Sequence, residues 1–124
     1  MCEDDLFCGV NKTKAASVED MPDLDKKHTP VIEAPAKVKK GEPFNVTVEV
    51  GKLLKHPNEN AHFIEWLELY SGDTFLTRVD FVPRLTDPKA VVSLALDHAH
   101  PLVARTRCNL HGVWESFQLD IDVK

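Results

Sequence analysis

The sequence predicts an all-β sandwich built as one domain, and three observations support this fold class. Apolar and polar residues alternate in several runs from residue 30 to the C-terminus, which is typical of strands with one buried face. Turn-forming residues separate these runs, and no long helical period interrupts them. A chain of 124 residues is long enough to bury one hydrophobic core and too short for a second module.

Residues 1–25 are expected to form an N-terminal arm, because they are rich in Asp, Glu, Lys and small residues and have no sustained period. Cys2 and Cys8 lie in this arm. A zinc or rubredoxin-like site needs four ligands, usually from paired Cys-x-x-Cys units. We therefore interpret the two cysteines as unpaired thiols and expect the folded domain to cover residues 26–124.

Four segments of this domain alternate clearly, and strands are expected at 44–50, 75–81, 92–96 and 117–123. The last is the most regular of them. Residues 62–70 hold five apolar side chains and fit either a strand buried on both faces or a short helix, and their aromatic and β-branched content favours a strand. Turns are expected at 40–43, 71–73 and 86–88.

Charge and composition exclude several classes of function. Fifteen basic against twenty acidic residues leave a net charge of -5, so nucleic acid is not an expected partner. No stretch approaches the ~20 consecutive apolar residues that span a bilayer, so a membrane is not expected either. The acidic N-terminus lacks the features of a secretory signal, and three scattered cysteines are unlike a disulfide framework. We expect a reduced, cytoplasmic protein.

Six histidines in so short a chain are the most informative feature. His56 and His62 lie close together in the sequence, and His111 follows Cys108 by three residues. Imidazoles suit iron, copper, zinc or nickel, and one thiolate among them predicts a redox transition metal. His98 and His100 would share one face of a strand, but as a pair they are interpreted as surface or turn histidines.

The chain resembles the superoxide reductases of the neelaredoxin and desulfoferrodoxin family, in their one-iron form. Each motif alone would be weak, but the combination in family order from about residue 26 to the C-terminus is specific. The motifs are Lys27-His28-Thr29-Pro30-Val31-Ile32-Glu33, His56-Pro57-Asn58 with His62, Phe63-Ile64-Glu65-Trp66-Leu67-Glu68-Leu69, and Cys108-Asn109-Leu110-His111-Gly112-Val113-Trp114-Glu115.

This resemblance implies an immunoglobulin-like β-sandwich that binds one iron per chain and reduces superoxide to hydrogen peroxide. Four equatorial imidazoles would come from His28, His56, His62 and His111, with the Cys108 thiolate as axial ligand. The resemblance also places the backbone N–H groups of Leu110 and His111 near the sulfur, and it implies an electron donor such as rubredoxin and a homotetramer.

One position departs from the family pattern. Members commonly carry a Glu two residues before the first ligand histidine, where it can bind ferric iron, and here that residue is Lys26. Asp25 or Glu33 could take its place. The following Lys27 matches the family and is our candidate catalytic residue. We expect Lys26 and Lys27, with Lys52 and Lys55, to form a local positive funnel for superoxide.

Two other classes of protein compete with this interpretation. A blue-copper electron carrier is also a β-sandwich, but its site takes two His, one Cys and commonly an axial Met. Met1 and Met21 both lie in the arm, and no Met follows Cys108. The other class is an immunoglobulin-like binding module that holds no metal.

Overall fold

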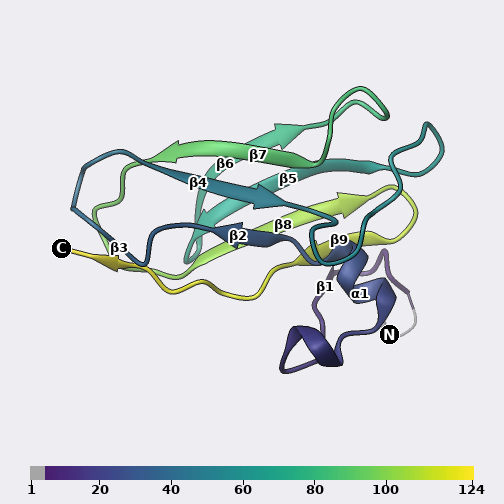
Figure 1. Ribbon diagram of the computed structural model, residues 1–124, viewed down its shortest axis with the longest axis horizontal. Coiled ribbons are helices and arrows are strands. Elements are labelled where there is room, and N and C mark those ends of the chain that lie inside the picture. The colour runs from purple at the N-terminus through teal and green to yellow at the C-terminus, as the bar shows by residue number, and fades with distance from the viewer. Residues whose placement is uncertain (1–4) are drawn as a thin grey trace.

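The computed structural model describes residues 5–124 and has the expected all-β sandwich fold (Figure 1). One layer is a five-stranded sheet with the order β1-β9-β8-β5-β6, and the other is a three-stranded sheet with the order β2-β4-β7. A two-stranded sheet, β10-β3, lies at the end of the molecule near the C-terminus. The elements are β1 (Val10–Asn11), η1 (Val18–Asp20), α1 (Asp23–His28), β2 (Val31–Glu33), β3 (Lys37–Val38), β4 (Phe44–Glu49), β5 (Ile64–Ser71), β6 (Thr74–Asp80), β7 (Lys89–Leu94), β8 (Leu102–Cys108), β9 (Gly112–Glu115) and β10 (Asp122–Val123).

The core lies between the two main sheets and follows from the alternation of the sequence. Val46 and Val48 of β4 are fully buried, and so are Leu67 and Leu69 of β5 and Leu102 of β8. These residues belong to one apolar cluster. Because successive side chains of a strand point to opposite faces, the residues between them are left half-buried or exposed.

Four of the expected strands are present as β4, β5, β6 and β7, with ends that differ by a few residues. The expectation for 117–123 is wrong, because only Asp122–Val123 forms a strand there. Leu119 makes an isolated bridge to Leu102 of the five-stranded sheet, whereas β10 pairs with β3. The segment therefore crosses between sheets and changes its hydrogen-bonding partner, although Ile121 still points into the core.

The described part of the arm, residues 5–25, is more ordered than its composition indicated. β1 extends the five-stranded sheet by pairing in parallel with β9, and the Asn11 side chain donates to the carbonyls of Leu6 and Val113. Gly112, at the start of β9, has a φ of 80° and lies so close to the arm that a Cβ there would collide with the Leu6 carbonyl. Helix α1 spans the expected boundary between residues 25 and 26.

The expectation of an unpaired thiol at Cys8 is also wrong, because Cys8 is disulfide-bonded. The Cys8 N–H donates to the Asp5 carbonyl at 3.0 Å and closes a turn, a local fold that the cysteine spacing does not reveal. Cys2 lies outside the described residues. Within residues 5–124, neither helix is long and apolar enough to cross a bilayer.

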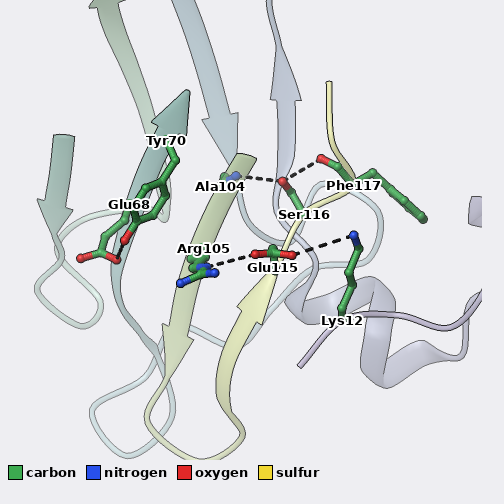
Figure 2. A network of polar contacts seen from close by, with 8 residues as sticks. All are labelled: Lys12, Glu68, Tyr70, Ala104, Arg105, Glu115, Ser116 and Phe117. Atoms are coloured by element: carbon green, nitrogen blue, oxygen red, sulfur yellow. Dashed lines mark hydrogen bonds and ion pairs between the residues drawn. The ribbon is translucent and has the colours of Figure 1, made fainter. Parts of the chain in front are cut away.

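Polar contacts on the outer side of the large sheet connect the arm to the sandwich (Figure 2). Lys12 lies 3.9 Å from Glu115 of β9, and Glu115 accepts a hydrogen bond from Arg105 of β8 at 3.0 Å. Ser116 is buried, and its hydroxyl accepts from the Ala104 N–H at 2.9 Å. These contacts hold the chain that leaves β9 against β8.

Candidate metal centre

The elements and loops that carry the five predicted ligand residues converge at one end of the sandwich, near α1 (Figure 1). His28 is the last residue of α1, and Cys108 is the last residue of β8. His56 and His62 belong to the connection between β4 and β5, and His111 lies in the turn between β8 and β9. Segments that are up to 83 residues apart in the sequence therefore converge here.

The four imidazoles form a closed cycle with nearly equal sides. Ring centroids are 4.8 Å apart for His28 and His56, 4.8 Å for His56 and His62, 5.2 Å for His62 and His111, and 4.8 Å for His111 and His28. Each ring thus has two imidazole neighbours. This is the arrangement expected of four side chains that surround one ion.

Hydrogen bonds to the backbone determine which ring nitrogen faces the cycle. His28 Nδ1 lies 2.7 Å from the Leu24 carbonyl, and His56 Nδ1 lies 2.6 Å from the Pro57 carbonyl. A carbonyl only accepts, so in the neutral rings both Nδ1 atoms carry the proton and both Nε2 atoms carry a lone pair. These Nε2 atoms lie 3.2 Å from each other. Metal-binding histidines are typically held by their outer nitrogen in this way.

Among residues 5–124, His62 Nε2 is buried without a hydrogen-bond partner. A buried polar atom without a partner costs free energy unless a ligand binds to it. Ligand atoms of His28, His56, His62 and Cys108 all lie within 4.8 Å of one another. The unpartnered nitrogen and the facing lone pairs together fit a bound cation.

Cys108 is fully buried, and its Sγ lies 3.6 Å from His111 Nδ1. Burial raises the pKa of the thiol, while hydrogen bonds from the backbone N–H groups of Leu110 and His111 oppose that shift. Those two donors were implied by the family resemblance, and the structure confirms them. A metal ion would offset the cost of burying the thiolate.

Burial also determines the protonation of the imidazoles. It lowers the pKa of His28 to about 4 and the pKa of His56 to about 4, and it lowers the pKa of His62. These three rings are therefore neutral at pH 7. Since a metal competes with protons for imidazole nitrogen, a cation that enters the site at neutral pH would not have to displace protons from these rings.

Trp114 is a supporting residue that contacts two of the predicted ligands. Its ring stacks on His28 with centroids 5.2 Å apart, and its indole N–H donates to the His111 carbonyl at 2.9 Å. The sequence placed Trp114 in the Cys108 motif but did not reveal either contact. A buried Trp whose N–H finds a partner fixes both neighbours.

Some of the charged side chains around the site are already paired with other residues. Lys27 is near enough to His28 and His62 to lower the pKa of both rings. Asp25 accepts a 2.6 Å hydrogen bond from Thr13, and Glu33 pairs with Lys52. Both acids that could replace the family Glu thus have partners elsewhere, and the charge of Lys52 is partly offset.

His98 and His100 are exposed, with ring centroids 6.2 Å apart, and they lie outside the cluster of ligand residues. The interpretation of this pair as surface histidines is confirmed. The cycle of four imidazoles also distinguishes the site from a blue-copper centre, which takes two.

Known proteins resemble this chain over most of its length. Residues 20–117 match the protein family described as desulfoferrodoxin. A relative from Methanocaldococcus jannaschii is 42% identical over 112 residues, which span 88% of this chain and 90% of the relative. The superoxide reductase of Pyrococcus horikoshii is 39% identical over 99 residues, covering 73% of this chain and 84% of its own. The solved structure of superoxide reductase (neelaredoxin) from Ignicoccus hospitalis has a TM-score of 0.71 at 44% identity, covering 78% of this chain and 81% of that chain.

Proposed function

Because the chain belongs to the desulfoferrodoxin family, we propose that it is a superoxide reductase with a mononuclear iron site. The ligands would be the imidazoles of His28, His56, His62 and His111 and the thiolate of Cys108. The observation that carries the proposal is the closed cycle of four imidazoles beside a buried thiol. Iron bound there would supply the one electron that, with two protons, converts superoxide to hydrogen peroxide.

The protein contributes the ligand field and its orientation. Backbone carbonyls hold His28 and His56 with their Nε2 lone pairs facing each other, so little rearrangement is needed on binding. Two backbone N–H groups hydrogen-bond the Cys108 sulfur and tune how strongly the thiolate donates electron density. Burial of the sulfur keeps water from competing with these donors.

Lys27 is the residue that we assign to attracting the substrate. Its ammonium acts electrostatically on His28 and His62, which places positive charge beside the imidazole cycle of an otherwise acidic protein. Lys52 is the weaker candidate, because it is paired with Glu33. We therefore expect Lys27→Ala to slow the reaction with superoxide and to weaken its dependence on ionic strength more than Lys52→Ala does.

The decisive experiment is rapid mixing of the iron-loaded, fully reduced protein with a pulse of superoxide. The thiolate-to-ferric charge-transfer band is followed while peroxide and oxygen are quantified. A reductase gives one peroxide per superoxide and no oxygen. Evolution of oxygen would instead indicate dismutation, and an absent or slow reaction would contradict the proposal.

Three further properties are proposals that rest on the family resemblance or on the sequence. We propose an electron donor such as rubredoxin, a homotetramer and a cytoplasmic location. Light scattering coupled to size-exclusion chromatography tests the tetramer, and reduction of the ferric protein by rubredoxin in stopped flow tests the donor. The cytoplasmic location is tested by cell fractionation.

A further inference from the structure

Asn109, the residue after the axial cysteine, joins two ligand-bearing segments. Its side-chain carbonyl accepts a hydrogen bond from the Phe63 N–H at 2.9 Å, and its side-chain NH₂ donates to the Ala61 carbonyl at 3.0 Å. Its backbone N–H donates to the Phe63 carbonyl at 3.2 Å. Ala61 and Phe63 are the two neighbours of His62 in the chain, so one asparagine holds the backbone on both sides of that ligand.

We propose that Asn109 is a positioning residue that sets the distance between the Cys108 thiolate and the His62 imidazole. Through the same turn, it also holds the N–H groups of Leu110 and His111 on the sulfur. The inference rests on the metal site proposed above, and it is independent of the reaction with superoxide.

The end of the β5–β8 ladder explains why a side chain is needed here. Ile64 pairs with Cys108, and the register between the strands is irregular on the other side of that pair, between Ile64 and Trp66. Beyond Ile64 and Cys108, within the described part of the chain, all three hydrogen bonds between residues 58–63 and 109–111 involve Asn109. Without its side chain, a single 3.2 Å backbone bond would remain.

The chemistry of the contact requires an amide. The Phe63 N–H needs an acceptor and the Ala61 carbonyl needs a donor, and only a side chain with both groups satisfies them together. In Asn109→Asp the first bond persists, and a carboxylate oxygen then faces the Ala61 carbonyl. In Asn109→Ala both bonds are lost, which leaves the half-buried Phe63 N–H without its acceptor and the exposed Ala61 carbonyl without its donor from the turn.

Cobalt(II) is the probe for the test, because its thiolate charge-transfer band and its affinity report the site without any turnover. We expect Asn109→Ala to lower cobalt affinity about 10- to 100-fold, as is typical when an outer partner of a ligand is removed, and to shift the charge-transfer band. The cobalt affinity and band position of Asn109→Asp should lie between those of Asn109→Ala and the wild type. This second variant provides a test if the alanine variant does not fold.

The matched control is Asn58→Ala. The Asn58 side chain donates to the Thr86 carbonyl at 3.1 Å and accepts from the Arg84 N–H at 2.8 Å. The Asn58→Ala variant therefore also loses two hydrogen bonds, but neither of them reaches the Cys108 turn. We expect it to lower thermal stability and to leave the cobalt band in place. An unchanged band and affinity in both Asn109 variants, or equal shifts in the Asn58 variant, would overturn the inference. Failure of the wild type to bind cobalt would overturn the metal site as well.

Discussion

The middle of the sandwich and its metal end bury different kinds of residues. In the middle, Val46, Leu67 and Leu102 are fully buried and need no partner beyond apolar contact. At the metal end, the buried groups are His28, His56 and Cys108, which contribute polar atoms. Apolar burial stabilises the fold directly, whereas buried imidazoles and a thiol become favourable only when hydrogen bonds or a cation complete them. We therefore expect the core to determine stability and the metal end to determine its dependence on pH and metal.

The largest expected effect comes from the core. Leu67→Ala removes a fully buried side chain between the sheets, and we expect the free energy of unfolding to fall by about 2–5 kcal/mol. Chemical denaturation of the metal-free protein measures it. Leu85→Ala is the control, because Leu85 is 77% exposed and its loss should change stability by no more than about 0.5 kcal/mol. Equal effects of the two variants would contradict the assignment of the core.

The metal end should make the stability of the metal-free protein depend on pH. The pKa values of His28 and His56 are lowered to about 4 from 6.5. Between these values the unfolded chain takes up protons that the folded chain does not, so the free energy of unfolding falls as the pH drops from 6.5 towards 4. At roughly 1.4 kcal/mol per pKa unit, each of these histidines should lower the free energy of unfolding by about 3 kcal/mol as the pH falls from 6.5 to 4.

Denaturation curves of the metal-free protein at several pH values between 4 and 7 measure this dependence. His56→Gln removes one of the two groups, and its unfolding free energy should vary less steeply with pH over that interval. If the variant and the wild type have the same slope, burial of His56 does not carry the effect.

A smaller effect is expected at Trp114, which contacts His28 and His111 at the metal end. Trp114→Phe keeps an aromatic ring on His28 but leaves the His111 carbonyl without its indole donor. The loss of this hydrogen bond should lower the free energy of unfolding by about 1 kcal/mol and weaken metal binding. Denaturation and a chelator competition measure the two quantities. Unchanged metal affinity would mean that Trp114 only fills space.

The smallest effect is expected on the outer surface. Lys12 lies 3.9 Å from Glu115 and its side chain is 45% exposed, so Lys12→Ala should change stability by less than about 0.5 kcal/mol. A loss above about 1 kcal/mol would show that the arm depends on this ion pair (Figure 2) rather than on the pairing of β1 with β9.

The segment at 117–123 marks the limit of prediction from periodicity. Its alternation correctly placed Ile121 in the core, because alternation reports which side of an extended chain is apolar. It did not predict that the hydrogen-bonding partner changes from β8 to β3 along the segment. The order of the arm was not predicted because β1 has only two residues, too few for any period. This strand is held by contacts with β9, about a hundred residues away in the sequence.

The sequence by itself predicted the sandwich class, because alternation is a local property of a chain, and the family resemblance of its motifs implied the ligands His28, His56, His62, His111 and Cys108. Only the tertiary structure decided that Asn109 holds both sides of His62 and that Asp25 and Glu33 are held by other residues. Those facts depend on contacts between segments that are distant in sequence, and such contacts exist only once the sheets have packed.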